Sequence, residues 1–284
     1  MKNNRYLLKA AFACLFAFVL SCSKESSGPE FEQKDVSVNV SVQSSVPVSF
    51  QSGDQISLLF HRDKANILGQ NTLTTANGTT FTESAYMEKS SKYWFLSPAA
   101  SLNYANPDYI YASVPPSQTL SEGGPAASSV VAVGETGSLE GSVTLTPAVA
   151  FLRFTVSGEV ANQVTTATIT SETGYLGGDV KIAHPGSSSP ETVSDFLRGI
   201  STPTHNVMLK GSVTPGAAYY AAVVPGTFED GLSVTLSDPS GNGTTITLPQ
   251  SYTLKAGEVV DLGNLELGDQ FEKNINLTRV LKAT

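Results

Sequence analysis

Side chains that carry covalent or metal chemistry are few in this 284-residue chain. It has two cysteines and three histidines, and His61, His184 and His205 stand at unrelated positions without the spacing of metal ligands. No Gly-x-Ser-x-Gly motif is present to mark a nucleophile elbow, although a Ser-His-Asp set assembled by the fold would leave no such mark. We therefore predict a protein that is not an enzyme and that needs no cofactor and no metal.

Positive charge is also scarce, with 17 Lys and Arg against 25 Asp and Glu. Three of the basic residues lie before residue 10 and no acidic residue does, so the chain from Cys22 onward has a net charge of −11. Because phosphate binding needs clustered cations, nucleic acid and anionic membrane surfaces are excluded as partners. Beyond residue 20, no apolar run approaches the length that spans a bilayer.

The first 21 residues have the features of an export signal. A basic start is followed by an apolar run over residues 10–20, which is too short for a spanning helix and fits the core of a signal peptide. Val19-Leu20-Ser21-Cys22 resembles a bacterial lipobox, in which signal peptidase II cuts before the cysteine and the thiol carries diacylglycerol. An ordinary secretory signal is the alternative, but it would leave a lone thiol in the exported chain.

We therefore expect a signal peptide over residues 1–21 and a lipid anchor on Cys22, which place the protein at the cell outer membrane. The other cysteine, Cys14, lies in the apolar run and is removed with it. The mature chain then has no disulfide, so its stability must come from apolar burial and strand pairing. Residues 22–35 are polar, contain Ser, Gly and Pro, and predict a flexible tether.

From residue 36 onward the pattern is that of β-strands. Valine alternates with small polar residues over 36–42, and the same period of two recurs over 150–156 and 232–236. A turn at 238–243 then leads into 244–248, which predicts a hairpin. Residues 219–224 are continuously apolar and predict a strand that is covered on both faces.

Helical periodicity is scarce, so an all-β fold is expected, and short strands between turn clusters favour sandwiches or barrels. We expect two domains, over residues 36–172 and 173–268, followed by a tail over 269–284. Residues 120–141 are rich in small side chains and predict a long surface loop, and 184–194 predict a linker.

Several of these segments resemble, in their order, the fimbrillin (Mfa-like) family of type V pilins and their accessory subunits. The resemblance rests on an aromatic residue, a Gly-Asp turn and an apolar strand, then aromatic strands, and finally a glycine-containing closing segment. The corresponding ranges are residues 50–60, 93–95, 109–115, 145–156, 219–226 and 255–265.

This resemblance implies two tandem transthyretin-like β-sandwich domains and assembly by β-strand exchange with other fimbrial subunits or with itself. In the tail, Ile275 and Leu277 alternate with polar residues and are the candidate exchange strand; the alternative is a last edge strand of the chain's own sandwich. Polymerising subunits of the family are cut after an arginine that follows the first strand. The first arginine after the signal here is Arg62, which is late for such a cut. An anchor or tip subunit, or a stand-alone adhesin, is therefore at least as well supported as a shaft pilin.

Aromatic residues between positions 86 and 111 raise a second hypothesis, a glycan-binding outer-membrane lipoprotein for nutrient capture. Surface glycans or proteins of a host or of other bacteria would be its partners. Aromatic side chains are favoured in strands for packing alone, however, and core packing is the preferred interpretation. The exposure of Trp94 distinguishes the two hypotheses, because a sugar platform must face solvent. The residues concerned are Tyr86, Tyr93, Trp94, Phe95, Tyr104, Tyr109 and Tyr111.

Overall fold

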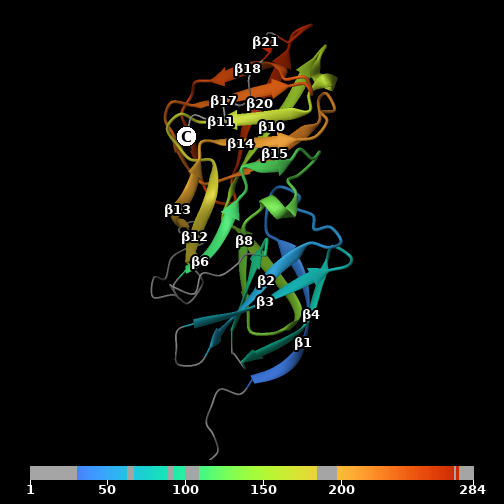
Figure 1. The fold of residues 1–284 in the computed structure, drawn as a ribbon, viewed down its shortest axis with the longest axis vertical. Helices are drawn as coiled ribbons and strands as arrows, with labels where there is room; N and C mark the ends of the chain where they lie inside the picture. Colours follow the sequence, from blue (N-terminus) through green and yellow to red (C-terminus); the bar gives the residue numbers. More distant parts are fainter. Residues whose placement is uncertain are drawn as a thin grey trace, which may run out of the picture.

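The computed structural model describes residues 31–62, 67–88, 92–99, 109–183, 197–271 and 273–274. Within these ranges the chain is all β apart from two single-turn 3-10 helices, η1 (Ala127–Ser129) and η2 (Ala161–Gln163). None of the described helices is long and apolar enough to cross a membrane. The strands form two halves that follow one another along the long axis of the molecule (Figure 1). The expected signal peptide over 1–21, Cys22, the expected linker over 184–194, Ile275 and Leu277 lie outside the described residues.

The N-terminal half is a closed barrel rather than the expected two-sheet sandwich. Its strands follow the order β1-β4-β3-β2-β5-β8-β9. The barrel closes because β1 pairs with β4 on one side and with β9 on the other, which leaves the sheet without an edge. The strand bounds are β1 Phe31–Val42, β2 Gln55–Arg62, β3 Ile67–Thr75, β4 Thr80–Glu88, β5 Tyr93–Ser97, β8 Ala132–Thr136 and β9 Glu140–Pro147.

Strand β1 confirms the valine alternation and begins earlier than the sequence predicts. Val36, Val38 and Val40 are buried in the barrel core, while the residues between them face solvent. The strand starts at Phe31, inside the expected tether, because residues 31–35 continue the antiparallel ladder with β4. Backbone pairing of this kind needs no apolar side chains, so the sequence pattern does not reveal it.

Residues 127–141 of the expected surface loop over residues 120–141 instead belong to the barrel half. They include η1 and β8, and Val130, Val131 and Val133 are buried in the barrel core. Strand β8 pairs with both β5 and β9, so residues 132–136 lie inside the sheet. Small side chains are required there: a Cβ on Gly134 would come within 2.6 Å of the Thr144 carbonyl oxygen. The composition that suggests a loop thus reflects close packing.

The C-terminal half is a sandwich of two sheets. One sheet has the order β15-β10-β20 and the other β21-β18-β17-β11-β14-β7. Leu152, Phe154 and Tyr219 from the first sheet pack with Ile169 and Leu236 from the second in one hydrophobic cluster. The strand bounds are β7 Ser117–Thr119, β10 Ala150–Gly158, β11 Thr166–Thr170, β14 Asn206–Lys210, β15 Ala218–Val223, β17 Leu232–Ser237, β18 Asn242–Leu248, β20 Val259–Leu267 and β21 Lys273–Asn274.

Two smaller sheets complete the described fold. Strands β6 (Tyr109–Val114), β12 (Gly177–Ala183) and β13 (Leu197–Thr204) form a three-stranded sheet beside the barrel, and β16 (Gly226–Phe228) pairs with β19 (Tyr252–Leu254). Val180 and Ile182 of β12 join the barrel core, although they follow the expected domain boundary at 172/173. The C-terminal core, in turn, already includes Ala150 and Leu152. The two cores therefore do not divide the chain at a single point.

Strand β15 lies where the two cores meet, which explains its continuous apolar run. Tyr219, Ala221 and Val223 belong to the C-terminal core, whereas Ala222 and Val224 belong to the barrel core. Successive side chains of a strand point to opposite faces, so each face of β15 is covered by a different half of the molecule. The predicted strand with two covered faces is confirmed.

Candidate strand-exchange sites

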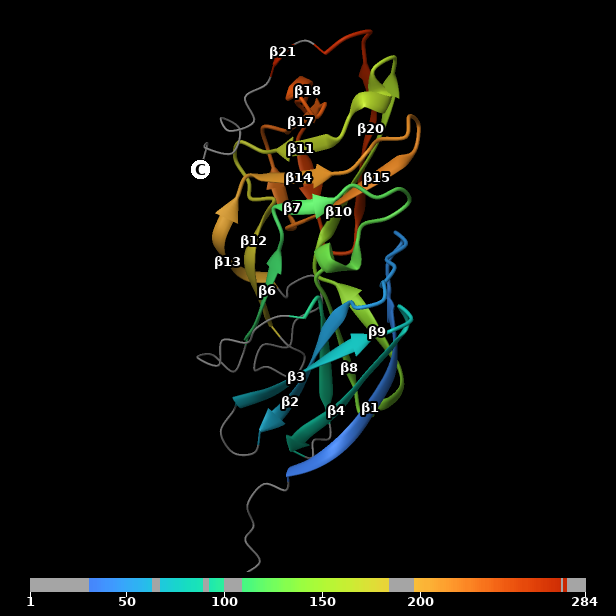
Figure 2. The same ribbon diagram turned by 45° about the vertical axis from the view of Figure 1, so that its right-hand side comes forward.

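Strand β1 occupies a slot in the barrel wall that is defined on both sides by backbone pairing. Residues 31–39 run antiparallel to β4, and residues 37–42 run parallel to β9. Backbone hydrogen bonds fix its far end, from Val40 N to Thr79 O at 2.9 Å and from Gln43 N to Leu145 O at 2.7 Å. The strand is blue in Figure 2, along the outside of the lower half. If β1 left this slot, β4 and β9 would each lose one of their two pairing strands.

The side of the slot that faces the barrel core is apolar. Val36, Val38 and Val40 are at most 7% exposed and pack in the same cluster as Phe81 and Leu145. Burial of a valine side chain is worth about 1.5–3 kcal/mol, so these three contribute on the order of 5–9 kcal/mol as an upper figure. A barrel without β1 would therefore expose a hydrophobic groove that only another extended, alternating strand could fill.

Arg62, the candidate cleavage residue, ends β2 and does not follow β1 directly. Its backbone pairs with Ile67 of β3, and β2 lies between β3 and β5. A cut after Arg62 would therefore separate both β1 and β2 from the rest of the barrel. Strand β2 carries Ile56, Leu58 and Leu59, all fully buried, so its loss would remove a large part of the barrel core.

At the C-terminal end, the start of the tail pairs within its own chain. In β21, Lys273 pairs with Gly243 and Asn274 with Asn242, both at the beginning of β18. Ile275 and Leu277 follow directly and lie outside the described residues. The described start of the tail thus lies at the edge of the six-stranded sheet, which is where a self-paired last strand would continue.

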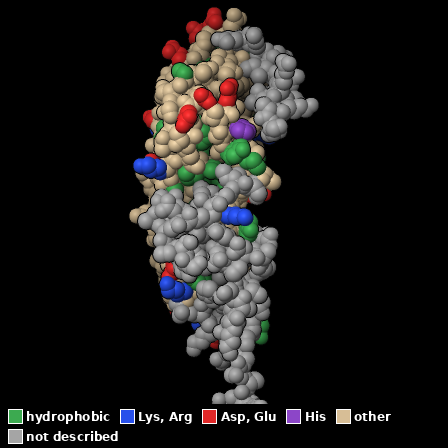
Figure 3. Space-filling view, turned by 90° about the vertical axis from the view of Figure 1, so that its left-hand side faces the viewer, with side chains coloured by type: hydrophobic (Ala, Val, Ile, Leu, Met, Phe, Trp, Pro, Cys, Tyr) green, Lys and Arg blue, Asp and Glu red, His purple; other side chains and the backbone are tan. Residues whose placement is uncertain are grey.

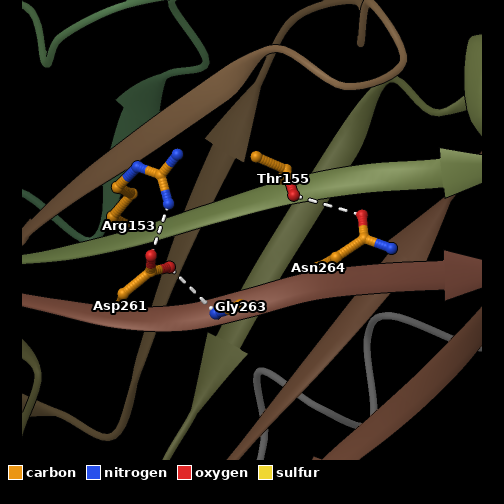
Figure 4. A network of polar contacts seen from close by, with 5 residues as sticks. All are labelled: Arg153, Thr155, Asp261, Gly263 and Asn264. Atoms are coloured by element: carbon orange, nitrogen blue, oxygen red, sulfur yellow. Dashed lines mark hydrogen bonds and ion pairs between the residues drawn. The ribbon is translucent and has the colours of Figure 1, made fainter.

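Strand β20, which precedes the tail, has the features of a protected edge. Among the described strands it pairs only with β10, and its register shifts opposite Arg153 and Thr155. Figure 4 shows the polar contacts at this bulge. Arg153 Nη1 lies 2.5 Å from Asp261 Oδ2, and the Gly263 N–H donates to Asp261 Oδ1 at 2.9 Å.

The neighbouring Asp261 carboxylate raises the pKa of Arg153, so the guanidinium stays charged. On the same face, Thr155 Oγ1 donates to Asn264 Oδ1 at 3.1 Å. Bulges and charges on an edge strand prevent pairing with another chain. We therefore do not assign β20 as an acceptor edge.

Three consecutive aromatic residues that could form a sugar platform are core residues in the described part of the chain. Tyr93, Trp94 and Phe95 of β5 are at most 4% exposed, and Trp94 Nε1 donates to Glu135 Oε2 at 3.2 Å. Tyr86 is 66% exposed, and the only other large apolar side chain exposed within the described ranges is Tyr175. On the face in Figure 3, Asp and Glu side chains are spread over the C-terminal half. The burial of Trp94 supports the packing interpretation.

No group of three or more His, Cys, Asp and Glu side chains that could hold a metal ion occurs in the described part of the chain.

No family model matches the sequence, and no curated protein sequence matches it. Comparison with solved structures does find matches. The first is a protein from Bacteroides ovatus described as a "putative cell adhesion protein", with a TM-score of 0.52 and 12% identity over 84% of this chain and 94% of that one.

Two further matches are more distant in structure. A Bacteroides uniformis protein of the same description has a TM-score of 0.49 and 14% identity, over 81% of this chain and 92% of that one. The tip fimbrial protein Mfa3 from Porphyromonas gingivalis, with a C-terminal truncation, has a TM-score of 0.38 and 9% identity, over 76% and 82%. The chain is structurally similar to Bacteroidales fimbrial and adhesion proteins. At 12% identity, the first match shows a shared fold.

Proposed function

We propose that this chain is a fimbrillin-like lipoprotein of the cell surface, held to the outer membrane through Cys22, with a structural or adhesive role and no enzymatic activity. The N-terminal lipobox-like segment supports the anchor. The all-β fold shared with the B. ovatus protein, over 84% of this chain and 94% of that one, supports the structural or adhesive role. The buried Trp94 removes the main feature that would favour a glycan-capture protein.

Within this class, the chain acts as an anchor, tip or stand-alone adhesive subunit that keeps its first strand. The observation that carries this proposal is the position of β1 between β4 and β9, with Arg62 only at the end of β2. A shaft subunit must open a groove by losing one strand. Here a cut after Arg62 would remove two strands and their core residues, so it would damage the groove it is meant to open.

Partners join this subunit by strand exchange, and the candidate donor is the tail with Ile275 and Leu277. Ile275→Asp and Leu277→Asp distinguish the two fates of that tail. If it is a donor, the variants lose co-purification with other surface subunits and keep the melting temperature of the wild type. If it pairs with its own sheet, they melt several degrees lower, because an unpaired charge is costly to bury. Variants unchanged in both measurements would refute strand exchange through this segment.

The surface role is tested in cells that express the full chain. We expect palmitate labelling that depends on Cys22, antibody labelling of intact cells, and recovery of the protein in the outer-membrane or fimbrial fraction. Cys22→Ser should abolish the palmitate label and leave unprocessed or released protein. Labelling that persists in Cys22→Ser would refute the anchor, and protection of the wild type from antibody on intact cells would refute the surface location.

A further inference from the structure

A crevice runs along the end of the barrel that adjoins the C-terminal half, where it reaches the far end of the β1 slot at residues 40–42 and does not include β21. Three hollows of about 200, 440 and 650 Å³ form it, and neighbouring hollows share lining residues: Phe50, Asp54 and Ala127 among them, and Pro47 and Ser49. Its largest part has the volume of an ordinary ligand pocket. Its walls are the segment that leads from β1 to β2 and the segment that leads from β7 to η1, both between the two halves (Figures 1 and 2).

The walls are held in place by backbone contacts. Ser49 and Ala126 form an isolated parallel bridge, so the two segments run side by side in extended conformation. A Cβ on Gly124 would lie 2.0 Å from the Pro47 carbonyl oxygen, which shows how closely the two backbones approach. Glu122 forms a second bridge, to Tyr219 of β15. The crevice is therefore a built feature of the fold that contacts both halves.

The charged groups in the crevice are acidic and lack a cationic partner. Among the described lining residues none is Lys, Arg or His, whereas Asp54 and Glu122 both line the largest hollow. Asp54 Oδ2 accepts the Gln51 N–H at 2.7 Å, and Glu122 Oε1 contacts Thr214 Oγ1. None of the ion pairs between described residues includes either carboxylate. Both side chains are thus oriented by neutral groups and have no cationic partner among the described ion pairs.

We propose that this crevice binds an extended peptide segment of a partner protein that carries lysine or arginine. Hydroxyl groups, carboxylates and backbone carbonyls are acceptors, so they match ammonium and guanidinium donors and repel anionic ligands. A sugar ring would need an exposed aromatic face. The one aromatic ring in the described lining, Phe50, is 8% exposed and packs edge-on against Phe81 at 5.0 Å. The crevice adjoins the far end of β1, but peptide binding there needs no strand exchange and does not depend on the proposed function.

The test uses the folded chain from residue 22 onward and three fluorescent probes: an octapeptide of alternating lysine and valine, one of alternating glutamate and valine, and a neutral glucose hexasaccharide. Fluorescence anisotropy should show binding of the lysine peptide alone, and this binding should weaken as salt rises. Asp54→Asn and Glu122→Gln keep the acceptor atoms and remove the charges. Each should weaken binding by about two- to fivefold, and the double variant by about tenfold.

Ser128→Trp, at an exposed position of the lining, should block the crevice and abolish binding. Thr247→Trp, at an exposed position of β18, is the matched control and should bind as the wild type does. Equal melting temperatures confirm that both variants fold. Lysine-peptide binding that survives Ser128→Trp, or glutamate-peptide binding of equal strength, would overturn the proposal. Binding of the hexasaccharide alone would overturn the ligand class, and binding of no probe would overturn the site.

Discussion

The side chain of Gln118, in β7, takes the place of a neighbouring strand at the edge of β15, and its replacement gives a quantitative test of how the two sheets of the C-terminal half are joined. Its Nε2 donates to the Ala222 carbonyl at 2.6 Å and to the Pro115 carbonyl at 3.1 Å, and its Oε1 accepts the Ala222 N–H at 3.1 Å. Gln118 is 6% exposed and Ala222 is fully buried. Water therefore cannot replace these bonds without a rearrangement.

Gln118→Leu keeps the size of the side chain and removes all three bonds. It leaves the Ala222 N–H and carbonyl unpaired, and each unpaired buried group costs about 1–3 kcal/mol. Burial of the added apolar surface returns about 1–2 kcal/mol. We therefore expect a net loss of about 1–4 kcal/mol in the free energy of unfolding, and a fall in melting temperature of about 2–16 °C for a chain of this size.

Gln118→Glu keeps the shape of the side chain and its acceptor oxygen but removes the two hydrogen bonds that Nε2 donates. The carboxylate can still accept the Ala222 N–H, but it faces the carbonyls of Ala222 and Pro115 and repels them. The protonated acid can donate, so the variant should be least stable at pH 7.5 and recover toward wild type at pH 4.5. Urea denaturation of both variants and the wild type at the two pH values measures this. A Gln118→Leu protein as stable as the wild type at pH 7.5 would refute the reasoning.

Three further predictions concern single side chains. Val38→Asp places a charge inside the barrel and should prevent folding or lower the melting temperature by more than about 5 °C. Asn39→Asp, on the outer face of the same strand, should leave the melting temperature nearly unchanged. Equal effects of the two substitutions would refute the inward orientation of Val38. Tyr252→Phe removes a buried hydroxyl that has no partner among the described residues, so it should stabilise the fold by about 1 kcal/mol. Burial also raises the pKa of Tyr252, so the wild type should lose stability above about pH 10. The Phe variant should not show this loss. Hydrogen bonds from the Asn242 side chain and from turn N–H groups lower the pKa of Asp238, so Asp238→Ala should be less stable than the wild type at pH 7. Thermal melting should show this difference in stability disappearing below about pH 4, as the wild-type carboxylate is protonated.

The strands that the sequence predicts correctly are those in which apolar residues on one face alternate with mostly polar residues on the other. In β1, β10 and β17, alternate apolar residues such as Val38, Phe154 and Val234 face a core, and period two follows directly. The sequence also predicts the hairpin of β17 and β18 correctly. Within its turn, Asp238 accepts hydrogen bonds from the N–H groups of Ser240 and Asn242 and from the Asn242 side-chain amide. Local chemistry specifies these elements, so a single sequence is sufficient to find them.

The elements that the sequence does not reveal depend on distant partners. Strand β8 is hidden among small residues because Gly134 must fit beneath the backbone at Thr144. Barrel closure depends on the parallel pairing of β1 with β9, which lies about a hundred residues away and has no local signal. The role of Gln118 is likewise set by Ala222, and a polar residue in the middle of a three-residue strand is ordinarily expected to be exposed. The acidic crevice is similar, since Asp54 and Glu122 line the same hollow only in the folded chain.

The central claim, that this subunit keeps its first strand in place, is tested most directly on protein recovered from the cell surface. Intact mass and N-terminal peptide mapping of the outer-membrane fraction report which residue begins the mature chain. We predict a single species that begins at lipidated Cys22 and retains β1 and β2. A surface-assembled species that begins after Arg62 would contradict the claim, because it would show that the barrel opens by losing both strands.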